Sequence, residues 1–315
     1  MLVSNRLPRA CGKRMGGIRK ELTHNWDLYL LILPVVIYFL VFCYYPMYGA
    51  QIAFRDYRAM RGITGSEWVG LEHFRRFFSG AYAGRLLKNT FEISFYSLIV
   101  GFPMPIILAI MLNEVRLKWF KKTVQLVTYA PYFLSTVVMV GVLTNFLSLS
   151  GGLVNQIIVY FGGQPVNFMM EPRLFKTIYV LSGVWQGTGY GSIVYLAALA
   201  GIDATLYEAA TVDGASRWQR IVHITFPCLL PTAVIMLILN SGSIMNVGFE
   251  KVFLMQNDLN MATSDVISTY VYRSGLQNAD FSFATAVGLF NSVVSFVMVI
   301  VVNFIARKLG EVSLF

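Results

Sequence analysis

The side chains whose types and spacing suggest a specific role gather in one polar, helix-forming segment between two long apolar runs. This segment opens with the triplet Glu208-Ala209-Ala210 and continues at fixed intervals to Gly214, Ile224 and Pro227. Glu208 offers a carboxylate to a basic side chain, and the two alanines are small enough for another backbone to approach closely. The spacing indicates recognition: a folded segment at the membrane surface that another protein grips.

The local signals in this segment predict a helix-turn-helix. Asp203 can cap a short helix over residues 204–211, and Asp213-Gly214 then makes a turn, because glycine adopts a positive φ without steric cost. Ser216, followed three residues later by Gln219, is a capping box that starts a second helix. We expect the partner contact to use Glu208, Ala209, Ala210, Asp213, Gly214, Trp218, Ile224 and Pro227.

A second set of polar and aromatic residues lies inside two apolar runs. Amide side chains and aromatic rings suit sugar binding, so these residues are candidates for a substrate path: Trp185, Gln186, Thr188, Tyr190, Asn240, Ser243 and Asn246. The alternative is that they hold membrane helices together, at about 0.6 kcal/mol per contact. Gly187 and Gly191, spaced for close helix contact, favour that alternative.

Several kinds of chemistry have no residues to carry them. The sequence contains no G-x-x-x-x-G-K-[ST] loop, so phosphate binding by that route is excluded. The histidines His24, His73 and His223 are far apart and have no metal-ligand spacing. We therefore expect no catalytic residues, no metal and no cofactor bound by this chain. No carboxylate lies deep in an apolar run, which disfavours a proton relay.

The elements that position these residues are expected to be membrane helices. Of the 315 residues, 56% are hydrophobic and only 13% charged, which is far fewer charges than soluble domains carry. A helix needs about 20 apolar residues to cross a bilayer. Six runs meet this length: Leu28–Tyr48, Phe91–Leu112, Val124–Leu147, Tyr179–Leu199, Cys228–Val247 and Phe283–Ile305. A shorter apolar run, Leu153–Phe161, is expected to lie on the outer face. The fold class is all-α, polytopic, with six transmembrane helices.

The basic residues suggest the orientation. A tail over residues 1–27 contains six of them, so we expect it to face the cytoplasm. The membrane domain would then cover residues 28–306, with the polar loop 203–227 and a C-terminal tail over 307–315 also cytoplasmic. The first external loop is basic as well, which weakens this inference. That loop is either solvated at the lipid headgroups or docks an acidic partner or anionic oligosaccharide.

The polar loop resembles the EAA loop of the permease subunits of binding-protein-dependent (type I) bacterial ABC importers. That pattern is EAA, three residues, Gly, nine residues, Ile, one residue, Leu-Pro. The chain matches it at Glu208, Ala209, Ala210, Gly214, Ile224 and Pro227, with Phe226 where leucine is usual. The segments Trp68–Leu71 with Phe74, Asn89-Thr90, Ala109–Asn113 and Tyr195–Leu199 are similar to the carbohydrate class, including single-domain permeases for oligosaccharides and oligo-uronates.

The resemblance implies a half-pore for a sugar or oligosaccharide, acidic ones included, in a bacterial cell membrane. Its implied partners are a second similar permease, two ATPase subunits that bind ATP and Mg²⁺ and grip the EAA loop, and an external sugar-binding protein. No nucleic acid is expected as a partner. Two alternatives stay open: an ion-coupled secondary transporter and, least favoured, a membrane-embedded enzyme. The length, linkage and charge of the sugar are not written in the sequence.

Overall fold

The structure is a computed structural model that describes residues 24–310, and the side chains of residues 24–308. The basic tail predicted over residues 1–27 therefore lies almost wholly outside the described residues. The chain divides into two compact units, residues 1–51 and 52–315.

The first unit is a long apolar helix with irregular turns. It runs as α2 (Trp26–Tyr38), a π-helical stretch Phe39–Tyr44, α3 (Tyr45–Met47) and the start of a 3₁₀ stretch, Tyr48–Phe54. None of the residues of α2 is buried within the chain. A helix that is apolar on every side needs lipid or another protein around it. This segment is long and apolar enough to cross a membrane.

The second unit opens with a small β-hairpin whose geometry requires a glycine at position 70. Strands β1 (Arg55–Asp56) and β2 (Glu67–Trp68) pair antiparallel, with Arg55 opposite Trp68. Gly70 takes φ = 64°, a conformation that favours glycine, and its amide donates to the carbonyl of Phe54. A 3₁₀ turn, Ala59–Arg61, and the short helix α4 (Gly62–Gly65) connect the two strands. Helix α5 (Glu72–Ser79) follows the hairpin.

The helices of the second unit then follow in chain order. The first group is α6 (Ala83–Gly101), α7 (Pro103–Glu114), α8 (Lys118–Tyr129), a 3₁₀ turn Ala130–Phe133, α9 (Thr136–Phe146), α10 (Leu153–Tyr160) and α11 (Pro172–Ala200). The second group is α12 (Ala204–Val212), α13 (Arg217–Arg220), a π turn Ile221–Thr225, α14 (Phe226–Ser241), α15 (Phe249–Met255), α16 (Met261–Ser264), α17 (Ile267–Tyr272), a π turn Arg273–Gln277 and α18 (Phe281–Gly310).

The helical membrane fold is confirmed, while the number of spans falls between four and six. Within residues 24–310, four helices are long and apolar enough to cross a membrane: Trp26–Phe54, Ala83–Glu114, Arg217–Ser241 and Phe281–Lys308. Two bent pairs would bring the number to six if each is one span. The predicted run Phe91–Leu112 thus belongs to a longer helix that begins at Ala83.

Two predicted spans differ from what the structure shows. The run Val124–Leu147 is not one straight helix, because α8 and α9 meet at 105°. Pro131 lacks an amide hydrogen for helix continuation, and the hydroxyl of Ser135 caps the new helix at Val138. The run Cys228–Val247 is also displaced. Its helix begins before the run, at Arg217, and ends at Ser241, so Ser243 and Asn246 lie in the turns beyond it.

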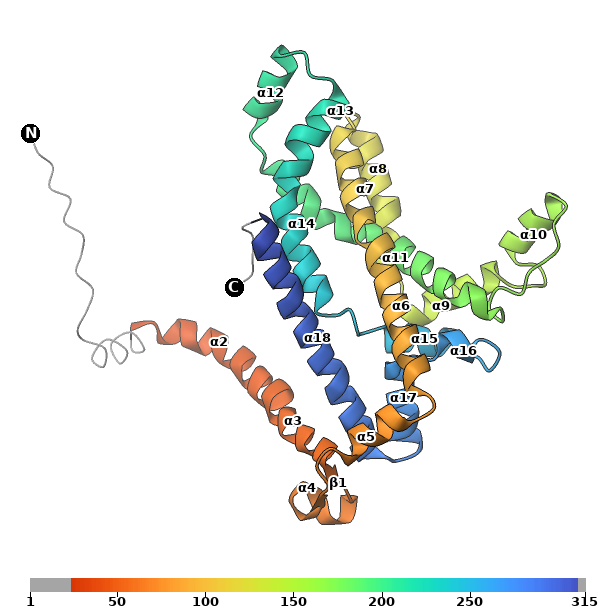
Figure 1. The fold of residues 1–315 in the computed structure, drawn as a ribbon. Coiled ribbons are helices and arrows are strands. Elements are labelled where there is room, and N and C mark those ends of the chain that lie inside the picture. Colours follow the sequence, from red (N-terminus) through yellow and green to blue (C-terminus); the bar gives the residue numbers. More distant parts are fainter. Residues whose placement is uncertain (1–23, 311–315) are drawn as a thin grey trace, which may run out of the picture. The chain divides into compact units, whose positions relative to one another are not determined.

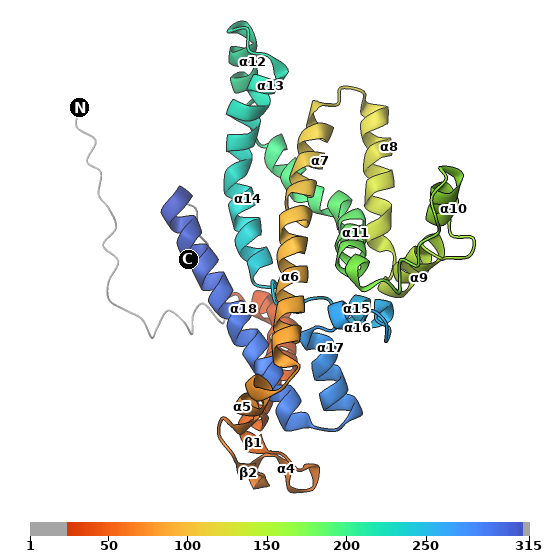
Figure 2. The ribbon, with the colours of Figure 1, turned by 45° about the vertical axis from the view of Figure 1, so that its right-hand side comes forward.

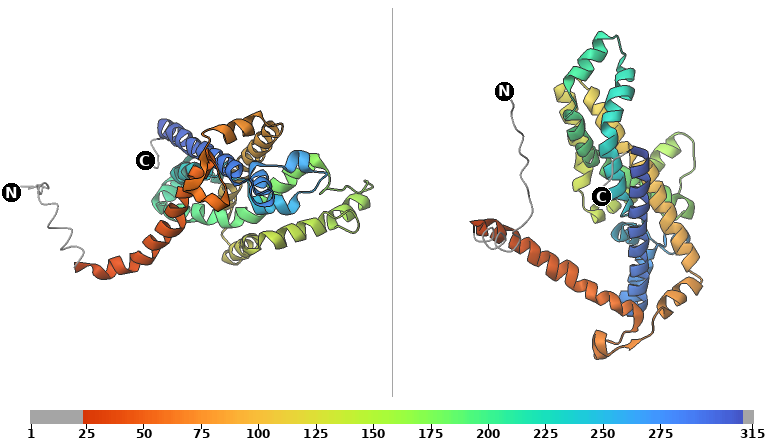
Figure 3. Two further views of the ribbon diagram at one scale, coloured as in Figure 1. Left: turned by 90° about the horizontal axis from the view of Figure 1, so that it is seen from below. Right: turned by 60° about the vertical axis from the view of Figure 1, so that its left-hand side comes forward.

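Helix α11 is the central element of the second unit and packs against α6, α7, α8 and α14. Figures 1 and 2 show α7 and α8 joined by a short loop, with α12 and α13 at the end of α14 and α15–α17 at the opposite end. The right-hand view of Figure 3 again shows α12 and α13 at the end of α14. The close contact of α11 with α8 occurs at Gly189, where a Cβ atom would stand only 2.0 Å from the carbonyl oxygen of Thr128.

Replacing Gly189 by Ala should destabilise this packing by about 1–3 kcal/mol, since the methyl group would overlap backbone atoms that cannot rotate away. The measurement is thermal unfolding of the purified protein in detergent. Gly187→Ala is the matched control, because its Cβ would meet nothing within 4 Å on the same helix. Equal unfolding temperatures for the two variants would contradict the close approach of α11 and α8.

Candidate functional site

The loop between α11 and α14 has the helix-turn-helix that the sequence predicts. The carboxylate of Asp203 accepts the Thr205 amide at 2.9 Å and caps α12, and this bond holds the pKa of Asp203 below its usual value. At the other end, the amide of Ala215 donates to Ala210 and that of Gly214 to Thr211. This is the Schellman pattern, with Gly214 at φ = 77°. The spacing between Ala210 and Gly214 in the sequence therefore follows from the way in which α12 ends.

The second half of the loop leads without interruption into α14. Ser216 and Gln219 form the predicted capping box at the start of α13. Pro227 has no amide to bond the carbonyl four residues earlier, and the helix widens into a π turn over Ile221–Thr225 just before it. Arg217–Ser241 nevertheless behaves as one continuous helix.

Two side-chain contacts hold the two halves of the loop together. The hydroxyl groups of Tyr207 and Thr225 lie 3.0 Å apart, and Arg220 donates to the hydroxyl of Thr211 at 2.8 Å. Periodicity gave no signal for these contacts, because they depend on the angle between the helices. Glu208 is exposed, and Trp218 is 72% exposed although it is a large apolar side chain. The loop is internally fixed, and at Trp218 it presents an apolar surface that the described part of the chain leaves uncovered.

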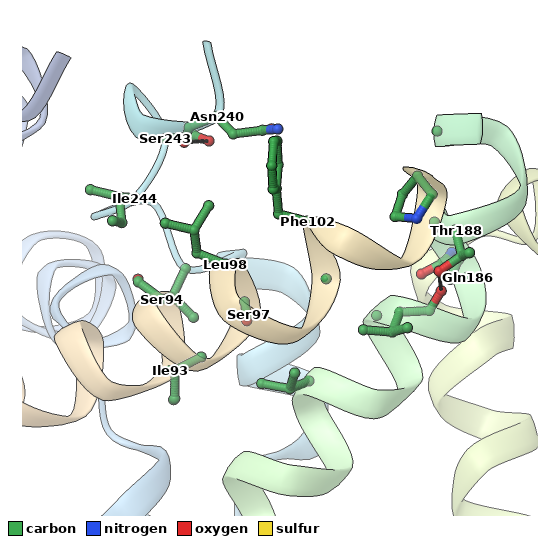
Figure 4. Close-up of a pocket in the computed structure, with 18 of the residues that line it drawn as sticks. Ile93, Ser94, Ser97, Leu98, Phe102, Gln186, Thr188, Asn240, Ser243 and Ile244 are labelled. Atoms are coloured by element: carbon green, nitrogen blue, oxygen red, sulfur yellow. Dashed lines mark hydrogen bonds between the residues drawn. The ribbon is translucent and has the colours of Figure 1, made fainter. Parts of the chain in front are cut away.

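A cavity of about 520 Å³ opens among α6, α7, α11 and the end of α14. Figure 4 shows Ser94, Leu98 and Phe102 on one helix, Gln186 and Thr188 on another, and Asn240 at the end of a third. Most of the polar groups are uncharged hydroxyls and amides that can donate or accept hydrogen bonds. The arrangement suits a polyhydroxylated ligand.

Five of the seven predicted substrate-path residues line this cavity. They are Gln186, Thr188, Asn240, Ser243 and Asn246. Thr188 and Ser243 also bond their own helix or turn carbonyls, at 2.6 and 2.9 Å, and Gln186 donates to the carbonyl of Leu134 at 3.1 Å. These bonds fix their orientation.

The other two predicted residues do not line the cavity. Trp185 is 51% exposed, and Tyr190 stacks on Tyr132 with ring centroids 3.9 Å apart. Trp185, Thr188 and Ser192 share a helical face in the sequence, yet Ser192 is fully buried and bonds the carbonyl of Gly189. A shared face therefore did not predict a shared environment.

Sequence reasoning missed several lining residues, of which Ser94, Ser97, Tyr179 and Lys251 carry polar groups. Ser94 and Ser97 could have been noticed as hydroxyls inside an apolar run. Lys251 gave no such signal, because it lies in a polar stretch expected to be external. Its burial comes from tertiary packing, and that burial lowers the pKa of the Lys251 ammonium to about 8. Among the described residues, no three His, Cys, Asp or Glu side chains are placed to hold a metal ion.

The fold and the site define a polytopic membrane permease of the ABC importer type. Residues 101–311 match the family described as the binding-protein-dependent transport system inner membrane component, and the chain belongs to this family. The predicted resemblance to this class is confirmed, as is the prediction of an importer permease.

Individual relatives match over nearly the whole chain. The Bacillus subtilis polygalacturonan/rhamnogalacturonan transport system permease protein YteP is 45% identical over 288 residues, covering 91% of this chain and 90% of the relative. Protein LplB of the same organism is 42% identical over 301 residues, covering 96% and 93%. A crystal structure of a bacterial ABC transporter involved in the import of the acidic polysaccharide alginate shows a TM-score of 0.86 at 43% identity, covering 93% of this chain and 99% of that one.

The turn at Gly214 generates a prediction. Gly214→Ala should weaken the end of α12 by about 1 kcal/mol, because an L side chain is strained at this positive φ. Hydrogen exchange at the Ala215 amide, which bonds the carbonyl of Ala210, should become faster. The control is Gly201→Ala, since Gly201 has φ = −86° and tolerates a side chain. Unchanged protection of Ala215 would be inconsistent with the helix end described here.

Proposed function

We propose that this chain forms half of the translocation path of an ATP-driven importer for acidic oligosaccharides. A second similar permease forms the other half, and an external binding protein delivers the sugar. ATP and Mg²⁺ bind to two separate ATPase subunits, while this chain itself catalyses no reaction and holds no cofactor. The observation that carries the proposal is the cavity of hydroxyls and amides in a chain whose relatives include polygalacturonan and alginate transport proteins.

The binding protein is a partner supported by a second structure of similar fold. This solved structure is a bacterial alginate ABC transporter in complex with alginate pentasaccharide-bound periplasmic protein. The match covers 94% of this chain at a TM-score of 0.86. Gln186, Thr188, Asn240, Ser243 and Asn246 are the proposed sugar contacts of this half. Trp185 and Tyr190, which do not line the cavity, stay predictions as substrate contacts.

The EAA loop is the proposed contact with an ATPase subunit. The proposed orientation places both termini of the chain in the cytoplasm. Exposed Trp218 and Glu208 offer an apolar surface and a carboxylate to that partner. The continuous helix Arg217–Ser241 runs from this loop to Asn240 at the cavity. Movement of the loop can therefore reach the sugar contacts directly. Coupling requires that the ATPase bind the two states of the permease with different affinity.

The energy source separates this proposal from ion-coupled transport. Proteoliposomes that contain the complete importer should take up labelled trigalacturonate or an alginate trisaccharide when ATP is enclosed on the ATPase side. Collapse of proton and sodium gradients should leave uptake unchanged, because no ion relay is involved. Uptake that needs an ion gradient and ignores ATP would reject the proposal.

Asn240→Ala tests the cavity. This variant should lower uptake several-fold, because a sugar hydroxyl would lose its amide hydrogen-bond partner in the cavity wall. Binding of the sugar to the external binding protein should be unaffected. The matched control is Asn278→Ala, since Asn278 lies outside the cavity lining, beyond the π turn Arg273–Gln277. Equal uptake in both variants would remove Asn240 from the path.

A further inference from the structure

Lys251 differs from every other residue in the cavity wall because its side chain alone carries a charge. The remaining lining side chains are apolar, hydroxyl or amide groups. Lys251 comes from α15, the short helix that follows the irregular segment beyond α14. The electrostatic sign of the cavity is therefore set by one ammonium group.

The ammonium group of Lys251 is buried with little compensation from the protein. The residue is 9% exposed, donates to the carbonyl of Tyr179 at 2.8 Å, and its Nζ lies 4.5 Å from the centroid of the Tyr179 ring. Within residues 24–308, no carboxylate forms an ion pair with it. An ammonium has three donors, so this geometry leaves donors for a ligand.

A second lysine in the same region shows the usual arrangement. Lys176 on α11 is also mostly buried, but it pairs with the carboxylate of Glu92 and donates to the side-chain oxygen of Asn89 at 2.9 Å. Buried lysines are almost always paired in this way, because an isolated ammonium is costly to remove from water. The fold thus satisfies Lys176 with an acid and leaves Lys251 without one.

The surroundings of Lys251 hold the ammonium at the cavity. A Cβ atom at Gly183 would lie 3.3 Å from its Nζ, so the glycine leaves space beside the charge. The Gly248 amide donates to the hydroxyl of Tyr179 at 3.1 Å and fixes the ring under the ammonium. With a pKa of about 8, the group is still mainly protonated at neutral pH.

We propose that Lys251 is a specificity-determining residue that pairs with a carboxylate of the saccharide as it passes through the cavity. The unmet partner is an anion, and the acidic sugar of the proposed function supplies one. This inference rests on that proposed function and assigns the charge recognition to one residue. A single flexible ammonium also forms a weaker and less directional pair than a bidentate guanidinium, which suits a ligand that must leave again.

The test uses the complete importer in proteoliposomes with labelled trigalacturonate as the probe. Lys251→Met keeps the length and apolar stem of the side chain but removes the charge, and it should lower uptake at least tenfold. Lys251→Arg should retain most of the uptake. Lys88→Met is the matched control, because the Lys88 side chain is 73% exposed and lies outside the cavity lining. Assembly of the complex and basal ATP hydrolysis show that each variant is folded.

Charge restoration separates recognition from packing. In a background in which Cys11, Cys43 and Cys228 are serine, Lys251→Cys should lose uptake. Modification with an aminoethyl thiosulfonate should recover it, whereas the methyl reagent should not.

Normal uptake by Lys251→Met overturns the inference and leaves the proposed function intact. Loss of uptake that neither Lys251→Arg nor the aminoethyl group relieves also overturns it, because the side chain then acts only through Tyr179. If the unaltered importer transports no acidic saccharide, the proposed function itself is rejected.

Discussion

Buried side chains that satisfy backbone groups are the interaction on which the rest of the structure depends. Between α14 and α17 the chain leaves regular helix, and a membrane protein must then pair the freed groups internally. Asn260, which is fully buried, donates to the carbonyls of Met169 and Met255. Asn89 donates to the carbonyls of Ala262 and Asp265, and the Asp265 carboxylate pairs with two arginines, Arg85 and Arg273. This network fixes the short helices that complete the cavity.

The same network fixes the segment after α14, which borders the cavity on one side. The helix Arg217–Ser241 borders the cavity on another side and connects it to the exposed loop. Asp265 and Asn260 anchor the segment that follows α14, whereas the helix Arg217–Ser241 begins in the exposed loop and then packs against α11 and α18. A displacement of that loop would reach Asn240 through this continuous helix, while Lys251 on α15 is bonded to the carbonyl of Tyr179 on α11.

The sequence was sufficient to predict helix caps and turns, which depend on neighbouring residues. The cap at Asp203, the turn at Gly214 and the box at Ser216 depend on residues within one helical turn, and all three were confirmed. Apolar runs located the membrane helices, but the break near Pro131 depends on how backbone groups are satisfied around a proline, and the start at Arg217 is set by the capping box at Ser216 rather than by the apolar run. Lys251 could not be predicted, since nothing near it in the sequence distinguishes a buried lysine from a solvated one.

The basic first external loop offered another source of positive charge for an acidic sugar, and the structure weakens it. Arg58 pairs with Asp56, Arg76 with Asp280 and Arg85 with Asp265. Arg55 bonds the carbonyl of Ser66 and lies over the ring of Trp68. The three ion pairs hold the loop and the helix ends together, and they offset the charges of Arg58, Arg76 and Arg85 before any ligand arrives. An ammonium in a cavity without a carboxylate is not offset, and low polarisability around it strengthens its field. Recognition of an anion is therefore better placed at Lys251 than at the basic entrance loop.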